Sequence, residues 1–384
     1  MTGRRLLLVN AEGAAVSAGG AETIVATLAR GLAERGWEIS VLAAFPTADP
    51  LELGSLTTLH STSWRTSQRR RVLNHVGDLV ASAAPRLVEA VRSERPDVVH
   101  THNLPGLSTS VWGAAADAGA RVVHTLHDYY LLCPRVSLLA PSGTPCRRGA
   151  VCSLRSRRLQ RWSGAVDDVV AVSRTLLDRH AGFFPRARQH VIRHPRPPLA
   201  PPSAPPASPP ATIGFLGALD VTKGVHVLLD AAPRLVELGY TLRIAGDGRL
   251  RPFVEDAAAR LPGVAYAGWV PAAERVAFLG ACDLGVVPSV WDEPGGPPLA
   301  LLDWLSAGRP VLSSGRGGLS ELQGARGVVE VEPTPDSLVG AAAALRNPHV
   351  WDELRADVRP PALPSLDEWV DAYERVFEEE ASED

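Results

Sequence analysis

Proline dominates residues 193–211, which read RHPRPPLAPPSAPPASPPA. Proline fixes φ and has no backbone N–H, so a segment of this composition cannot contribute strands to the interior of a sheet. We therefore expect a linker at residues 196–211. The 384 residues are enough for two cores of roughly 150–200 residues, one on each side of that linker.

Each half opens with the same pattern. A short apolar run, RRLLLVN at 4–10 or ATIGFLG at 211–217, is followed by a glycine-bearing turn and then by apolar residues at helical spacing. Repeated strand–turn–helix units are typical of parallel, doubly wound sheets. The sequence thus predicts an α/β protein with two Rossmann-like domains, residues 1–195 and 212–360, facing a central cleft. Residues 361–384 form an amphipathic helix that we expect to pack back on the first domain.

Composition excludes several classes of protein. A hydrophobic content of 45% and a charged content of 21% fit a globular protein. The net charge of −3 gives no reason to expect a nucleic-acid partner. Four cysteines do not make a disulfide framework, and the apolar run near the N-terminus is too short for a signal peptide or a membrane span. We expect a cytoplasmic protein with at most peripheral membrane contact.

Lys223 is the only lysine in the chain. The arginine bias around it suggests a GC-rich genome, in which lysine is kept where a compact ammonium is needed. Lys223 lies in GALDVTKG (217–224), one of three glycine turns that follow apolar runs, with AGDGR (245–249) and the stretch 288–312. Such turns suit a phosphorylated ligand at the rim of a parallel sheet. We interpret the second half as a nucleotide-sugar site, with chance survival of the lysine as the alternative.

Histidines mark two predicted strand ends in the first half. His100 and His102 end the run PDVVHTHN, and His124 and His127, followed by Asp128, end ARVVHTLHD. Ligands of open α/β sheets bind beyond the carboxyl ends of the strands. A site is therefore the preferred interpretation, and structural histidines are the alternative.

Other features leave two readings open. Cys133, Cys146 and Cys152 are spaced by 13 and 6 residues, so buried free thiols are favoured over zinc. The arginine cluster at 65–71 is either a solvated face or a contact with a phosphate-bearing acceptor or an acidic membrane surface. The cluster at 147–161 is either a solvated face or a contact with the acceptor.

Seven phrases, in order and at fitting separations, resemble the retaining glycosyltransferases of family 4, which have the GT-B fold. They are GGAE (19–22), DVVHTHN (97–103), TLHD (125–128), the G…KG of 217–224, AGDG (245–248), CDLGVVPSVWDEPGG (282–296) and DWLSAGRPV (303–311). The resemblance covers nearly the whole chain.

The resemblance implies roles for individual residues. Lys223 would contact the donor diphosphate, and Glu293 would bind hydroxyls of the donor sugar. His127 would lie beside the anomeric carbon, so His127, Glu293 and Lys223 are the expected catalytic residues. The full set of implied donor-binding residues is Gly20, Gly217, Lys223, Gly246, Asp247, Arg249, Glu293, Gly295, Gly296 and Asp303, and the acceptor-binding set is His102, His127 and Asp128.

The expected chemistry uses neither metal nor cofactor. No D-x-D motif stands out, so Lys223 and oriented N–H groups would stabilise the leaving diphosphate. Retention without an obvious nucleophile implies the front-face route, in which the leaving phosphate helps to deprotonate the acceptor.

Three features depart from the family pattern. Ala218 stands where an arginine is frequent, which makes Arg249 a candidate replacement. Glu293 and Asp303 are ten positions apart instead of eight, and the second acid is an aspartate. Pro297 and Pro298 remove N–H groups from the donor loop. These differences indicate a reshaped donor pocket.

We expect transfer of a sugar from a nucleoside-diphosphate sugar, UDP-linked in the first instance, to an acceptor hydroxyl. A small-molecule acceptor in antibiotic or other secondary metabolism is preferred because the donor loop is unusual and no hydrophobic docking helix stands out. A cell-envelope glycolipid or polysaccharide acceptor is the alternative. An epimerase on the same scaffold and a catalytically inactive partner protein are the rival functions, and the absence of G-x-G-x-x-G disfavours a dehydrogenase.

Overall fold

The structure is a computed structural model of the chain, and it divides into two compact units. It describes residues 4–11, 20–44, 55–58, 85–140, 143–195, 202, 204–296, 298–321 and 325–379. The first unit comprises Met1–Leu138, Arg147–Arg196 and Leu363–Asp384, and the second comprises Leu139–Cys146 and Pro197–Ala362. The loop at 12–19, the arginine cluster at 65–71 and Pro297 lie outside the described residues.

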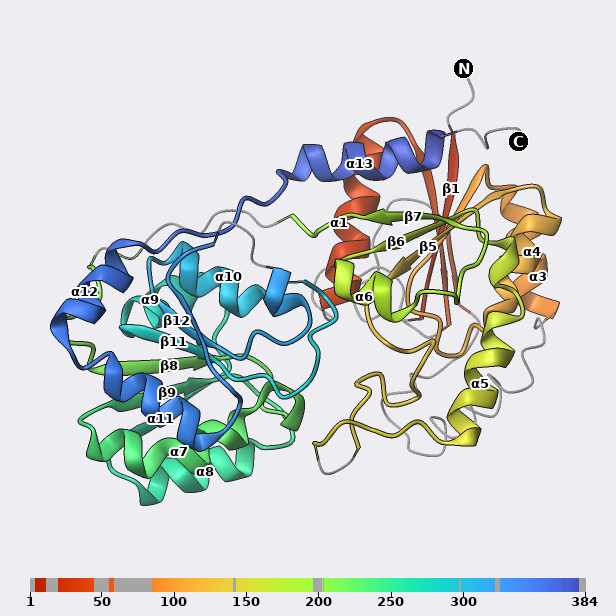
Figure 1. Cartoon of the computed structure of the whole chain (residues 1–384). Helices are drawn as coiled ribbons and strands as arrows, with labels where there is room; N and C mark the ends of the chain where they lie inside the picture. Colours follow the sequence, from red (N-terminus) through yellow and green to blue (C-terminus); the bar gives the residue numbers. More distant parts are fainter. Residues whose placement is uncertain are drawn as a thin grey trace. The chain divides into compact units, whose positions relative to one another are not determined.

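A seven-stranded parallel sheet forms the centre of the first unit (Figure 1). Its order is β3-β2-β1-β4-β5-β6-β7, so the direction of winding reverses between β1 and β4. Such a reversal leaves a crevice at the carboxyl ends of the two strands, where ligands of doubly wound folds bind. The strands are β1 (Arg5–Asn10), β2 (Glu38–Ala43), β3 (Leu56–Thr58), β4 (Val98–Thr101), β5 (Arg121–Leu126), β6 (Asp168–Ala171) and β7 (Arg188–Val191).

The strands of this sheet are buried on both faces because helices cover them. In β1, every residue from Leu6 to Asn10 is buried, which explains its continuous apolar run. The helices are α1 (Gly20–Glu34), α3 (Pro85–Glu94), α4 (Ser110–Asp117), α5 (Ala150–Gln160), the 3₁₀ turn η2 (Ser163–Ala165), α6 (Arg174–Arg179) and α13 (Leu366–Glu378).

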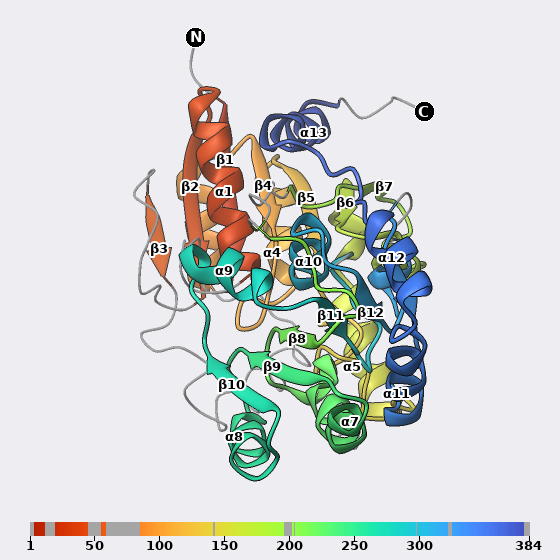
Figure 2. The same ribbon diagram turned by 90° about the vertical axis from the view of Figure 1, so that its left-hand side faces the viewer.

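Helix α13 lies beside α1 although the two are at opposite ends of the chain (Figures 1 and 2). Ser365 caps α13, and its side chain and that of Glu368 complete a reciprocal capping box. Trp369, Val370 and Tyr373 are fully buried in the cluster formed with α1 and β1. The C-terminal helix is therefore a part of the hydrophobic core of the first unit.

A six-stranded parallel sheet forms the second unit, in the order β10-β9-β8-β11-β12-β13. The winding again reverses, here between β8 and β11, so the two doubly wound sheets expected from the sequence are confirmed. The strands are β8 (Thr212–Leu216), β9 (Thr241–Ala245), β10 (Val264–Gly268), β11 (Leu284–Val287), β12 (Val311–Ser313) and β13 (Val328–Glu330).

Helices flank this second sheet as well. Figure 1 shows α7, α8 and α11 on one side and α9 and α10 on the other. The helices are α7 (Val225–Glu237), α8 (Arg251–Arg260), α9 (Arg275–Gly280), α10 (Leu299–Ser306), α11 (Pro335–Ala344) and α12 (Pro348–Ala356), with the 3₁₀ turns η3 (Val221–Lys223), η4 (Ala272–Glu274) and η5 (Gly318–Glu321). Within the described ranges, no helix combines the length and the apolar character needed to cross a bilayer.

Candidate functional site

An ion pair joins the ends of two adjacent central strands in the second unit. Lys223 ends η3, the turn after β8, and Glu293 lies in the loop after β11. The ammonium nitrogen of Lys223 lies 2.8 Å from each carboxylate oxygen of Glu293. Because β8 and β11 flank the reversal of winding, this pair occupies the place where doubly wound sheets bind their ligands.

Two further contacts fix the surroundings of the pair. The hydroxyl of Ser289 donates to Oε1 of Glu293, whose side chain is nearly inaccessible to solvent. The ammonium of Lys223 lies 5.3 Å from the ring centre of Trp291, within the range of a cation–π contact. The indole Nε1 of Trp291 is buried and has no hydrogen-bond partner among the described residues. The carboxylate is thus held rigidly, whereas the lysine side chain keeps partial access to solvent.

Glycine allows the two strand ends to approach closely. Gly224 has φ of +72°, and a Cβ atom there would lie 1.8 Å from the carbonyl oxygen of Pro288. A side chain at this position would therefore push the lysine turn away from the loop that carries Glu293. The main chain of Val290 also donates to the Thr222 carbonyl at 3.0 Å, which ties the loop to the turn.

The other predicted donor-side residues around β8 and β9 form a neighbouring layer of turns. Gly217 follows β8 and donates to the Ala245 carbonyl at 3.1 Å, and Gly246 and Asp247 follow β9. The guanidinium of Arg249 is exposed and pairs with Asp220, 2.8 Å away. Arg249 therefore lies beside the turn that contains Ala218, but Asp220 neutralises its charge.

The remaining predicted residues of this unit lie along the loop from β11 into α10. Gly295 is exposed, and Gly296 is buried against Gly318. Asp303 lies within α10, is almost fully buried, and pairs with Arg275 at 3.5 Å. The buried carboxylate of Asp303 is therefore already paired with a cation.

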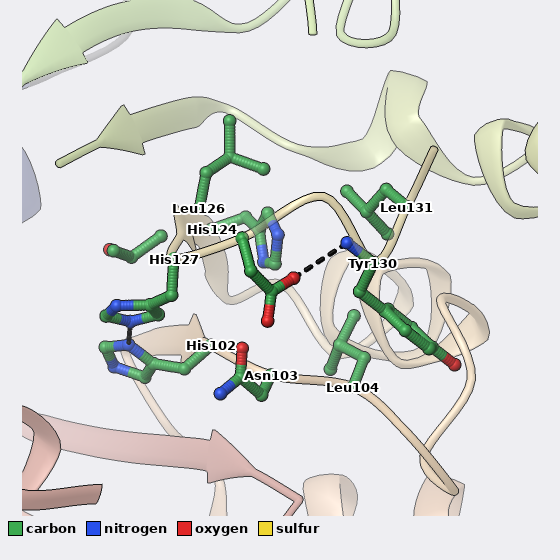
Figure 3. Close-up of a pocket in the computed structure, with 10 residues that line it drawn as sticks. His102, Asn103, Leu104, His124, Leu126, His127, Tyr130 and Leu131 are labelled. Carbon is green, nitrogen blue, oxygen red and sulfur yellow. Dashed lines mark hydrogen bonds between the residues drawn. The ribbon is translucent and has the colours of Figure 1, made fainter. Parts of the chain in front are cut away.

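The first unit brings the predicted acceptor-side residues together in one small pocket (Figure 3). His102 follows β4 and His127 follows β5, and their rings share a hydrogen bond of 2.9 Å between Nδ1 and Nε2. Asp128 also lines the pocket, with Asn103 and Tyr130. The first residue of α1 is Gly20, at the end of the loop after β1.

Burial keeps the histidines of this region uncharged. Desolvation lowers the pKa of His102 and of His127 well below its usual value, and neighbouring histidines lower both further. A hydrogen bond between two neutral imidazoles needs one ring as donor and the other as acceptor. The Nε2 atom of His102 is buried and has no hydrogen-bond partner in the part of the chain that the structure describes.

Asp128 is the acid of the pocket. Desolvation raises its pKa to about 6, although the main-chain N–H of Tyr130 donates to its Oδ1 at 2.7 Å and opposes the shift. Arg155 also opposes the shift, and its guanidinium stacks on the Tyr130 ring at 4.5 Å. A carboxyl group with this pKa can exchange a proton near neutral pH.

Within the described ranges, ligand atoms spaced for a metal ion are confined to one cluster of side chains. Cys133, Cys146 and Cys152 are free thiols. Among the described residues, the one group with ligand atoms close enough to hold a metal ion is Asp168, His190 and Glu379. Asp168 already pairs with Arg121 at 2.6 Å and with Arg188 at 2.9 Å, so positive charge surrounds this group.

Sequence reasoning missed Ser289, Trp291 and Asn103. Ser289 and Trp291 precede Glu293 by four and two positions, and both were visible in the phrase PSVWDEPGG. Only the geometry of the loop shows that the serine hydroxyl reaches the carboxylate and that the indole lies beside the lysine.

Two family models match the chain. Residues 18–197 match the model described as Glycosyltransferase Family 4, and residues 210–347 match the model described as Glycosyl transferases group 1. The two matches lie on either side of residues 198–209.

Curated relatives match over most of the chain. An uncharacterized protein in the cps region of Klebsiella pneumoniae is 28% identical, over 83% of this chain and 87% of its own length. A glycogen synthase of Mycobacterium tuberculosis is 29% identical, over 89% of this chain and 85% of its own. The 2-deoxystreptamine glucosyltransferase of Streptomyces kanamyceticus is 27% identical, over 67% of this chain and 70% of its own.

Solved structures share the fold. The sucrose-phosphate synthase of Thermosynechococcus elongatus matches with a TM-score of 0.67 and 16% identity, over 97% of this chain and 98% of its own. Anabaena HepE in complex with UDP matches with a TM-score of 0.61 and 17% identity, over 97% of this chain and 95% of its own. The chain therefore belongs to the glycosyltransferases of the GT-B fold, with a family 4 N-terminal half and a group 1 C-terminal half.

Proposed function

We propose that this glycosyltransferase transfers a sugar, with retention of anomeric configuration, from a UDP-sugar to an acceptor hydroxyl. The observation that carries the proposal is the Lys223–Glu293 pair at the carboxyl ends of β8 and β11. An ammonium group has three N–H donors, and two are directed at Glu293, which leaves one for a phosphate oxygen. Glu293, held by Ser289, would in turn accept hydrogen bonds from the donor sugar.

The choice of UDP has a separate basis. Structures of Anabaena HepE hold UDP and UDP-glucose, and that protein shares the fold. In the proposed reaction, the bond between the anomeric carbon and the diphosphate breaks, a bond to the acceptor oxygen forms, and the acceptor proton passes to the leaving phosphate. Lys223 stabilises the charge that develops on that phosphate, and the pocket of His102, His127 and Asp128 binds the acceptor.

Different observations support the two acceptor classes. Similarity to the 2-deoxystreptamine glucosyltransferase favours a small-molecule natural product. Similarity to the protein of the cps region, which extends over more of the chain, favours an envelope polysaccharide or glycolipid. A membrane-bound acceptor was disfavoured because no hydrophobic docking helix stood out in the sequence. Val151 and Leu154 of α5 are exposed apolar side chains, so that argument against a membrane-bound acceptor is weaker.

A thermal-shift screen against UDP, GDP, ADP and TDP tests the donor without knowledge of the acceptor. A ligand that binds only the folded state raises the midpoint by mass action. We expect a rise with UDP that Lys223→Ala abolishes, whereas Arg260→Ala, which removes an exposed cation from α8, keeps it. A rise with another nucleotide alone would refute the UDP assignment, and an unchanged rise in Lys223→Ala would refute the site. The anomeric configuration of the product, read by NMR, tests retention.

A further inference from the structure

Helix α5 carries an unusual concentration of positive charge on its exposed side. The segment 147–161 holds six arginines and no acidic residue, in a chain whose net charge is −3. Arg155 alone among them is buried. The five exposed arginines, which together with Val151 and Leu154 we call the α5 face, are Arg147, Arg148, Arg157, Arg158 and Arg161.

The arginines of the α5 face have no acidic partner among the described residues. Several exposed arginines elsewhere on the surface are matched: Arg234 pairs with Asp336, Arg251 with Glu255 and Arg326 with Asp357. In the α5 face, Arg161 stacks on Trp162 at 5.6 Å, and no ion pair within the described ranges involves the other four. An uncompensated cluster of this kind raises the local positive potential and attracts a polyanion.

Two large apolar side chains project from the same face. Val151 is 72% exposed and Leu154 is 50% exposed. They lie three positions apart, and Arg158 and Arg161 continue the same side of the helix at intervals of four and three. Apolar side chains ringed by unpaired arginines are typical of helices that lie in the headgroup region of an anionic bilayer. A nucleic-acid surface would instead favour polar or aromatic residues between the cations.

Two other residues of α5, Arg155 and Leu159, are buried and fix the helix to the first unit. Leu159 is fully buried, and Arg155 donates to the Tyr130 carbonyl at 2.7 Å while its guanidinium stacks on the Tyr130 ring. Tyr130 lines the pocket of His102 and His127. The helix is therefore a rigid support between the exposed arginines and the wall of that pocket.

We propose that the α5 face docks the protein on the surface of an anionic lipid bilayer. The arginines pair with lipid phosphates, and Val151 and Leu154 enter the boundary between headgroups and acyl chains. This inference does not rest on the proposed sugar transfer. It is tested without any donor or acceptor.

The test is co-sedimentation of the full chain with vesicles. One set consists of phosphatidylcholine alone, and the other contains equal parts of phosphatidylcholine and phosphatidylglycerol. We expect binding to the anionic vesicles only. Arg157→Gln with Arg158→Gln should weaken that binding about 30-fold, since each cation near an anionic surface contributes about a fivefold gain in partition. Val151→Ser with Leu154→Ser should weaken it about tenfold.

The matched control is Arg251→Gln with Arg260→Gln, which removes two exposed charges from α8 and should leave vesicle binding unchanged. Circular dichroism melting of each variant verifies that its fold is intact. Equal binding to both vesicle types, an equal loss in the α8 control, or full retention of binding by either α5 variant would overturn the proposal. Displacement of the protein from anionic vesicles by a stoichiometric DNA duplex would overturn it in favour of nucleic acid.

Discussion

Lys223 and Glu293 are 70 positions apart in the sequence, and the ammonium of one lies 2.8 Å from both carboxylate oxygens of the other. The pair spans the two strands between which the second sheet reverses its winding. Glu293 is buried and Lys223 is partly exposed. Water can solvate the ammonium but not the carboxylate, so the charge of Glu293 depends on the pair for its stabilisation more than the charge of Lys223 does. The same contact is therefore expected to contribute both to stability and to donor binding.

Breaking this pair from the lysine side should destabilise the second unit. Lys223→Met leaves a buried carboxylate without its cation, and we expect a loss of about 1–3 kcal/mol in the free energy of unfolding, the cost of an unsatisfied buried polar group. Adding Glu293→Gln removes the unpaired charge and should restore most of that loss. Denaturant unfolding of the two single variants and the double variant measures the coupling.

Donor binding should respond differently. The double variant is expected to be stable and yet unable to bind UDP, since the proposed contact of Lys223 with the diphosphate is lost. If the effects of the two substitutions on the free energy of unfolding are simply additive, the ion pair does not contribute to stability. If the double variant binds UDP normally, Lys223 does not belong to the donor site.

The close approach of the lysine turn to the Glu293 loop leads to a second prediction. Gly224→Ala places a methyl group against the Pro288 carbonyl at a φ of +72°, so it should cost about 3 kcal/mol or more. Gly268→Ala is the matched control, because Gly268 has the same φ and no described atom lies near the position that a Cβ would take there. At Gly268 only the unfavourable backbone conformation of alanine lowers the free energy of unfolding, by about 1 kcal/mol. Denaturant unfolding measures the free energy of unfolding of both variants. Equal losses would show that the turn moves away from the Pro288 carbonyl without an energetic cost.

Much of the fold could be predicted from the sequence because parallel strands buried on both faces read as short apolar runs. Arg5–Asn10 and Thr212–Leu216 are examples, and the turn residues after them marked the strand ends. The grouping of Leu139–Cys146 with the second unit was not predicted. Gly143 packs near Val221, and a contact of this kind depends on tertiary packing that no local pattern records.

The site was predicted unevenly for a similar reason. Residue type and position indicated Lys223, Glu293 and His127, whereas their partners follow from geometry alone. Nothing in the sequence pairs Arg249 with Asp220 or Asp303 with Arg275, because each contact joins separate segments of the second unit. The roles of these residues in catalysis remain predictions.

Stability of the first unit should fall steeply in mild acid. Burial lowers the pKa of His100 and of His124 to about 3 and that of His194 to about 4, so the folded unit keeps them neutral. Below pH about 6.5 the unfolded chain binds protons that the folded unit does not, so the free energy of unfolding rises with pH between about 4 and 6.5. In this window each histidine raises the free energy of unfolding by about 1.4 kcal/mol for every unit of increase in pH.

Asp128 acts in the opposite direction. Its pKa of about 6 in the folded unit exceeds the unfolded value, so between about 4 and 6 the folded unit gains a proton first and offsets one histidine. Asp128→Asn should steepen the acid loss, and His100→Gln should make it shallower. Hydrogen exchange of β5 peptides against pH measures both, with β9 of the second unit as internal reference. A loss shared equally by β9 would show that the buried histidines are not its cause.

The seating of α13 on α1 leads to the last prediction. Gly31 is buried in α1, and a Cβ atom there would lie 2.6 Å from Cγ2 of Val370 in α13. Gly340 in α11 is exposed and has no described neighbour near its Cβ position, so Gly340→Ala should stabilise by about 0.5–1 kcal/mol through helix propensity alone. Gly31→Ala makes the same gain in propensity but should destabilise by about 1–3 kcal/mol, because α13 must shift.

Relief of the clash completes this test. Val370→Ala removes the methyl groups that would meet the new side chain, so the double variant Gly31→Ala/Val370→Ala should be more stable than the sum of the two single effects. Hydrogen exchange over residues 366–378 should increase in Gly31→Ala and remain unchanged in Gly340→Ala. Stabilisation by Gly31→Ala equal to that by Gly340→Ala would mean that α13 is not seated on this face of α1. The buried ring of Trp369 would then be exposed in solution, and its fluorescence would shift to the red.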